Sequence, residues 1–123
     1  MYPERTVLLV DGDVDSRTVY RAVLQHCGYR VLEAEDGLMA VALAVSDRPD
    51  LVVTELTVPK LSGFDLLQRL RTQDATHGMR TIVLSAVAFD EDRQRAYAAG
   101  CELFLAKPVE PKELVYEIDK LIG

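Results

Sequence analysis

Three carboxylates, two hydroxyls and one lysine stand at or just after the ends of short apolar runs of the chain. They are Asp11, Asp13, Glu55, Thr57, Ser85 and Lys107. Carboxylate oxygens, together with water and phosphate oxygens, are the ligands that Mg²⁺ prefers. A lysine and a hydroxyl facing such a site bind the oxygens of a phosphoryl group, where phosphoryl transfer places its charge. Brought together, these side chains would form a crevice for Mg²⁺ and phosphate.

The apolar runs alternate with amphipathic segments, and this alternation predicts the fold. The expected strands are 6–10, 30–34, 51–56, 81–85 and 103–106, and each is followed by an expected helix. Such βαβ units have right-handed crossovers, which place all strands in one parallel sheet with helices on both faces. The common strand order for five units is 2-1-3-4-5, and its ligand crevice lies at the carboxyl ends of strands 1 and 3. We predict this α/β architecture for one domain, residues 1–123.

The spacing of apolar residues also predicts which side of each helix faces the sheet. In the second helix the expected core residues follow the i, i+3, i+4, i+7 pattern: Leu38, Val41, Ala42 and Val45. In the first helix they are Val19, Val23 and Cys27, with Tyr20 and Leu24 beside them. Cys27 and Cys101 lack metal-ligand spacing, so we expect both to be reduced core residues.

Composition limits the classes of partner. The 123 residues include 14 basic and 20 acidic ones, and the net charge is −6. This balance argues against direct nucleic-acid binding, which depends on neutralising phosphates with Lys and Arg. The sequence has neither an apolar run of about 20 residues nor the features of a signal peptide. We therefore expect a cytoplasmic module that meets other proteins and not a membrane.

Four segments carry a family resemblance: LLVDGDVDSR, DLVVTELTVPKLSG, TIVLSA and AAGCELFLAKPV. In order and spacing they resemble the signature segments of response-regulator receiver domains in two-component signalling. The resemblance implies a flavodoxin-like fold and a histidine kinase or another signalling protein as partner, and it implies no enzyme activity beyond self-phosphotransfer. By position, Asp11 matches a metal-binding acid, while Ser85 and Lys107 match the phosphate-binding pair. Phe104 matches the aromatic residue whose rotation accompanies activation.

Two departures from the family pattern affect the site. Gly12 stands where the family has a second adjacent acid, and Glu55 stands where it has the aspartate that accepts phosphate. The extra C–C bond shifts the carboxylate by about 1.5 Å, and a misplacement of about 1 Å costs on the order of a hundredfold in rate. We predict a pseudo-receiver in which Glu55 reaches toward Lys107 and Ser85 and partly imitates a phosphate.

The implied metal ligands are the carboxylates of Asp11, Asp13 and Glu55 and the backbone carbonyl of Thr57, and Mg²⁺ is expected to bind weakly or not at all. For Asp13, an N-cap of the first helix is an equal alternative. One alternative function is a receiver that still takes phosphate on Glu55. A more distant one is a haloacid-dehalogenase-like phosphatase with Asp11 as nucleophile and Asp13 as acid/base. That class needs a later acidic pair, whereas residues 109–123 have the pattern of a helix.

Two further expectations come from the resemblance. The Lys107–Pro108 peptide is expected to be cis, which aims the lysine inward. The fourth helix, fifth strand and fifth helix are expected to form the contact surface for partners, including a possible homodimer. Its candidate residues are Arg93, Tyr97, Phe104, Lys112 and Tyr116.

Overall fold

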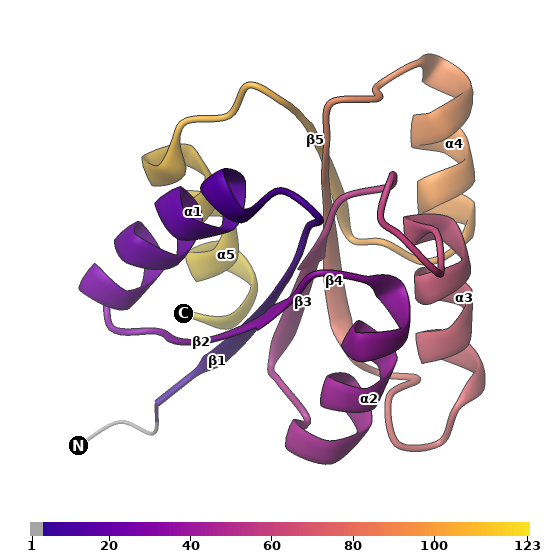
Figure 1. Ribbon diagram of the computed structural model, residues 1–123, viewed down its shortest axis with the longest axis horizontal. Helices are drawn as coiled ribbons and strands as arrows, with labels where there is room; N and C mark the ends of the chain where they lie inside the picture. Colours follow the sequence, from indigo (N-terminus) through magenta and orange to yellow (C-terminus); the bar gives the residue numbers. More distant parts are fainter. Residues whose placement is uncertain (1–3) are drawn as a thin grey trace.

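Five parallel strands form one sheet in the predicted order, β2-β1-β3-β4-β5 (Figure 1). The computed structural model describes residues 4–123. The strands are β1 (Thr6–Val10), β2 (Arg30–Ala34), β3 (Leu51–Thr54), β4 (Arg80–Ser85) and β5 (Leu103–Ala106). Val10, the last residue of β1, pairs with Ala34 of β2 and Thr54 of β3, so these strands end side by side. This register aligns the carboxyl ends of the strands, where the sequence predicts the crevice.

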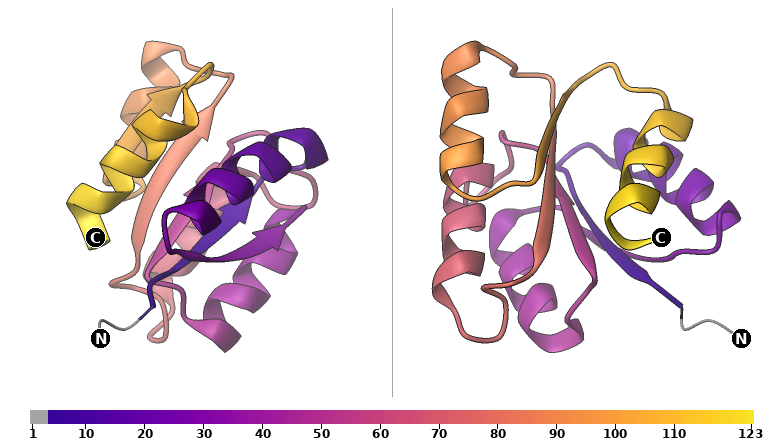
Figure 2. Two further views of the ribbon diagram at one scale, coloured as in Figure 1. Left: turned by 90° about the vertical axis from the view of Figure 1, so that its left-hand side faces the viewer. Right: turned by 180° about the vertical axis from the view of Figure 1, so that it is seen from behind.

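Helices cover both faces of the sheet (Figures 1 and 2). One face carries α1 (Val14–His26) and α5 (Pro111–Ile122), and the other carries α2 (Gly37–Asp47), α3 (Gly63–Thr72) and α4 (Asp90–Ala98). The predicted α/β, flavodoxin-like fold is thus confirmed. No helix within residues 4–123 has the length and apolar character needed to span a bilayer.

The central strands are buried on both faces, as expected for a parallel sheet between two helix layers. Val7 and Leu9 of β1 pack with Leu24 of α1 and Ile118 of α5. Leu8 and Val10, which alternate with them, pack in a second cluster on the side of α2 and α3. Each fully buried leucine or valine stabilises the fold by roughly 1.5–3 kcal/mol relative to an exposed one. The two clusters together hold the strand ends in fixed positions.

The predicted orientation of α2 is wrong. Leu38 and Val45 are 47% and 39% exposed, whereas Ala40 and Ala44 are buried in the core. The segment GLMAVALAV is apolar on all sides, so its periodicity allows two helical phases. The observed phase turns the small alanines inward, which lets α2 lie close to the sheet and to α3.

A similar shift affects α1, where the predicted stripe of core residues is only partly correct. Val19 is 51% exposed and Cys27 is also exposed, while Leu24 is buried and Tyr20 and Val23 pack beside it. The expectation that Cys27 is a core residue is wrong, because it follows the last turn of α1 as its C-cap. Cys101 is buried, as expected.

The orientation of α2 can be tested by replacing alanine with leucine on the buried and on the exposed side of the helix. Ala44→Leu should lower the free energy of unfolding by about 1–3 kcal/mol, because the added atoms overpack the core. Ala42→Leu, on the exposed side of the same helix, should change it by less than about 0.5 kcal/mol. Urea unfolding followed by circular dichroism measures both values. Equal costs at the two positions would contradict the observed orientation.

Candidate functional site

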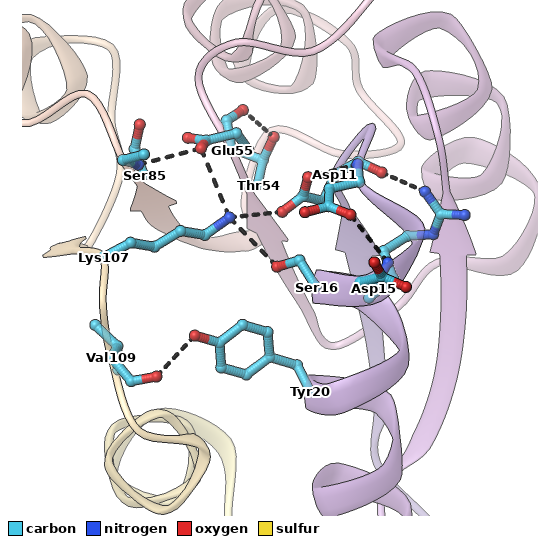
Figure 3. A network of polar contacts seen from close by, with 12 residues as sticks. Asp11, Asp15, Ser16, Tyr20, Thr54, Glu55, Ser85, Lys107 and Val109 are labelled. Carbon is cyan, nitrogen blue, oxygen red and sulfur yellow. Dashed lines mark hydrogen bonds and ion pairs between the residues drawn. The ribbon is translucent and has the colours of Figure 1, made fainter.

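The backbone itself carries three of the predicted residues to one edge of the sheet. The ladder continues one residue beyond the strands, with Asp11 N–H donating to the Ala34 carbonyl (3.1 Å) and Glu55 N–H donating to the Val10 carbonyl (2.9 Å). In the same way Lys107 N–H donates to the Ser85 carbonyl (2.8 Å). The side chains of Asp11, Glu55 and Lys107 therefore meet at the carboxyl edge, as predicted (Figure 3).

Lys107 is the centre of this group. Its Nζ lies 2.8 Å from Asp11 Oδ2, 3.6 Å from Glu55 Oε1 and 3.3 Å from Ser16 Oγ. The expected proximity to Glu55 is confirmed, although Asp11 is the nearer partner. Burial alone would lower the pKa of the Lys107 ammonium, but the hydrogen bond and charge of Asp11, with the charge of Glu55, raise it above its usual value. Lys107 thus stays protonated and holds both carboxylates in place. The Lys107–Pro108 peptide is cis, as predicted.

Glu55 lies just after β3 and is only 6% exposed. Its Oε2 accepts the N–H of Leu56 (2.8 Å) and its Oε1 accepts the N–H of Ala86 (3.1 Å), in addition to the ion pair with Lys107. Gly63 lies against the backbone here, since a Cβ at that position would come within 2.5 Å of the Glu55 carbonyl oxygen. Both carboxylate oxygens of Glu55 therefore already have donors.

The hydroxyl of Ser85 has a different contact from the one expected. Ser85 is fully buried, and its Oγ accepts the N–H of Val87 (3.0 Å). At this end of β4, the group that donates a hydrogen bond to the Glu55 carboxylate is the backbone N–H of Ala86. Glu55 reaches the end of β4 as predicted, but through a main-chain donor.

The side chains predicted to bind a metal have protein partners in this structure. Asp11 Oδ2 is paired with Lys107, and its Oδ1 accepts the N–H of Asp13 (2.9 Å). The side chain of Asp13 is exposed and accepts the N–H of Asp15 (3.0 Å), so Asp13 is the N-cap of α1. Thr57 is exposed in the loop after β3. Within residues 4–123, no three His, Cys, Asp or Glu side chains are grouped as a metal site would need.

Three residues of α1 take part in the site although the sequence reasoning did not select them. Ser16 contacts Lys107, Arg17 donates to the Asp11 carbonyl, and the Tyr20 hydroxyl donates to the Val109 carbonyl (2.7 Å). Burial, the largest effect, raises the pKa of Tyr20. Ser16 and Tyr20 are one turn apart and so share a face of the helix. The i, i+4 spacing of Ser16 and Tyr20, directly after the acidic loop, is the sequence feature that could have predicted their place in the site.

The space beneath this network is small. Asp11, Ser16, Tyr20 and Glu55 help to line a cavity of about 10 Å³, which is the size of a single water molecule. The interior side of the crevice is therefore filled by the protein's own side chains.

Phe104, the predicted switch residue, points inward and is buried. Its N–H donates to the Tyr97 hydroxyl (3.0 Å), and the Arg93 guanidinium lies 4.9 Å from the centre of its ring. On the predicted contact surface, Tyr97, Lys112 and Tyr116 are exposed, but the Phe104 side chain is covered in this conformation.

Comparison with known proteins agrees with this geometry. The family model described as "Response regulator receiver domain" matches residues 7–119. The chain belongs to this family. Among curated relatives, this receiver domain is 31% identical over 116 residues to the transcriptional regulator RpaA of Synechocystis, covering 94% of this chain and 48% of RpaA. It is 26% identical to the response regulator DivK of Brucella anthropi, covering 97% of both chains. The receiver domain thus spans about half the length of RpaA.

Solved structures give the same result for the fold. The chemotaxis response regulator CheY4 of Vibrio cholerae has a TM-score of 0.91 and 28% identity, with 98% of this chain and 100% of that chain covered. The receiver domain of the sensor histidine kinase PA1611 from Pseudomonas aeruginosa has a TM-score of 0.90 and 32% identity, with 98% and 99% covered. That structure holds a magnesium ion in its active-site cleft.

The unequal distances around Lys107 give a testable order of interaction energies. In double-mutant cycles with Lys107→Met, the coupling to Asp11→Asn should be about 1–2 kcal/mol and larger than the coupling to Glu55→Gln. The reason is the shorter contact to Asp11 and the two further donors of Glu55. The more exposed pair Arg80–Glu102 (3.2 Å) is the control, with an expected coupling below about 0.5 kcal/mol. Urea unfolding at neutral pH supplies the energies, and a larger coupling to Glu55 would contradict the geometry.

Proposed function

We propose that this receiver domain is a pseudo-receiver, which transmits a signal through protein–protein contacts without being phosphorylated on Glu55. The observation that carries the proposal is the state of the Glu55 carboxylate. It accepts two backbone N–H groups, faces the Lys107 ammonium and is almost fully buried. A carboxylate that attacks a phosphoryl donor must direct a free oxygen lone pair at the phosphorus atom. The two N–H bonds and the ion pair fix the direction of the Glu55 carboxylate, so turning an oxygen toward a phosphoryl donor strains or breaks at least one of these contacts and adds to the barrier.

The same contacts support partial imitation of a phosphorylated state. In the family the phosphoryl group is bound between the hydroxyl after strand 4 and the lysine after strand 5. The Glu55 carboxylate lies between the Ala86 N–H, directly after β4, and Lys107, directly after β5. Its longer side chain therefore supplies a permanent negative charge in this region. A carboxylate carries one charge and two oxygens, whereas a phosphoryl group carries nearly two charges and three oxygens, so the imitation is incomplete.

We further propose that Mg²⁺ binds weakly. The ion would compete with Lys107 for Asp11, would find no side chain at Gly12, and would have to remove Asp13 from its capping role. Mg²⁺ loses its water molecules reluctantly and requires nearly octahedral oxygen ligands. The donor set in this arrangement does not fit the ion, which supports a site that works without it.

The proposed partners are a histidine kinase or another signalling protein of the cytoplasm, with no direct contact to nucleic acid. The face formed by α4, β5 and α5 is the proposed surface for that contact or for a homodimer. Its exposed tyrosines, Tyr97 and Tyr116, supply large side chains with both apolar and hydrogen-bonding parts, which are common at protein interfaces.

Restoring the family residues tests the proposal. The double variant Glu55→Asp with Gly12→Asp should become phosphorylated by acetyl phosphate in the presence of Mg²⁺, and the wild type should not. Position 12 accepts a side chain with a small adjustment, since a Cβ there would lie 3.3 Å from Pro59 Cδ. Each single change should recover less, because nucleophile position and metal charge act on the same step. Intact mass measures the product.

The pair Glu55→Gln with Gly12→Asp is the matched control, because it restores an acid at position 12 but removes the acceptor. It should remain unlabelled. A stoichiometric phosphorylated adduct on the wild type would show that this is a phosphorylatable receiver with an unusual acceptor. Turnover of a generic phosphate ester by the wild type would favour the phosphatase alternative.

A further inference from the structure

A groove of about 440 Å³ lies where α3 and α4 meet. In Figure 1, α4 lies above α3 on the same side of the sheet. Its lining is Phe64, Gln68, Arg71, Thr72, Arg95 and the alanines 98–99. None of these residues belongs to the crevice. Two arginines and no acidic residue line the groove, which sets it apart from the rest of this acidic chain.

Both guanidinium groups are held in place by the protein. Arg71 Nη1 donates to the Ala98 carbonyl at the end of α4 (3.0 Å). Gly100 makes room for this side chain, because a Cβ at Gly100 would clash with Arg71 Cδ. The Arg95 guanidinium lies 4.0 Å from the centre of the Phe64 ring. An arginine that is already ordered loses less entropy when it binds an anion.

Neither guanidinium is neutralised. Within residues 4–123, no carboxylate lies within 4.0 Å of Arg71 or Arg95, whereas Arg17, Arg21 and Arg80 all have such partners. Capping α4 uses one of the five N–H donors of Arg71, and the contact of Arg95 with Phe64 is through the face of its ring. Structural roles therefore account for the positions of the two arginines but leave most of their donors available.

The surface continues beyond the groove on both sides. Gln68 and Thr72 also line an adjoining hollow of about 360 Å³, and Arg71 also lines another of about 250 Å³. A single phosphate ion would occupy a small part of this surface. The adjoining hollows also hold the carboxylates of Asp65 and Glu102, so the part of this surface that attracts a carboxylate is the groove itself. An extended peptide that places an acidic side chain in the groove fits this surface, because arginine binds carboxylates through two parallel hydrogen bonds.

We propose that the α3–α4 groove docks an acidic segment of a protein partner, with a carboxylate of the segment bound between Arg71 and Arg95. Gln68 and Thr72 supply polar groups for the peptide backbone beside it. The proposal does not depend on the state of Glu55, because the groove and the crevice share no residue.

The test uses the whole chain and a defined probe, a hexaglutamate peptide with blocked ends, with a hexaserine peptide as the uncharged comparison. Two-dimensional ¹H–¹⁵N NMR at low ionic strength should show shifts at Gln68, Arg71, Thr72 and Ala98, and hexaserine should cause none. Arg71→Gln with Arg95→Gln should weaken binding roughly tenfold or more. Arg48→Gln, which removes one charge from an exposed arginine at the C-cap of α2, is the matched control for each single arginine variant of the groove, and it should change affinity by less than about twofold.

The double variant also removes the hydrogen bond from Arg71 to the Ala98 carbonyl, which could disturb α4 itself. The single variant Arg95→Gln keeps that bond and tests the binding site alone. This variant alone should weaken binding roughly threefold or more, while the thermal unfolding midpoint falls only by the small amount that loss of the contact with Phe64 costs. Shifts spread over other basic residues, or equal weakening by Arg48→Gln, would overturn the proposal. The proposal is also overturned if inorganic phosphate shifts the groove signals and hexaglutamate does not, because the groove would then be a small-anion site.

Discussion

The ammonium of Lys107 between Asp11 and Glu55 is the contact on which the arrangement of the carboxyl edge depends. Two largely buried carboxylates repel each other and lose their hydration, and a nearby cation is needed to offset both costs. Lys107 supplies that cation from β5, the edge strand, across the ends of β4 and β3 to Asp11, which directly follows β1. Its reach therefore requires the strand order and the register that the core imposes. The packing of β1 and β3 brings the two carboxylates together. The charge of Lys107 offsets their repulsion and their loss of hydration.

The need for a cation and for donors also explains the contacts of Glu55. One more methylene group than aspartate takes its carboxylate far enough to meet the N–H of Ala86 while it still faces Lys107. The result is a polar network with a donor for every carboxylate oxygen of Asp11 and Glu55. Such a network is stable because nothing in it is missing, whereas a site that binds a metal ion and a phosphoryl group must keep positions open for them. In the proposed pseudo-receiver, the completeness of this network is what opposes phosphotransfer.

The strands and the crevice could be predicted from the sequence, but the orientation of two helices and part of the site could not. In β1 successive residues alternate between the faces of the sheet, and both faces are buried, so either phase places apolar side chains in the core. The orientation of the helix α2 is not settled in this way, since Leu38, Ala40, Ala44 and Val45 are all apolar and the choice between them depends on how closely the backbone approaches the sheet. Likewise, the carboxylate of Asp13 could bind a metal ion as far as residue type goes. Only the geometry of the first turn of α1 shows that it caps the helix.

The helix α4 joins the crevice to the α3–α4 groove. Its one buried residue is Ala96, which is a smaller apolar anchor than Leu24, the one buried residue of α1. Polar contacts do much of the anchoring instead: the Tyr97 hydroxyl binds the N–H of Phe104, and Arg71 binds the last turn. The loop that leads into α4 begins at Ala86, whose N–H is bound to Glu55. A chain of contacts becomes a switch only if an element along it has two arrangements. Because the apolar anchor of α4 is a single alanine, a shift of this helix would expose little apolar surface.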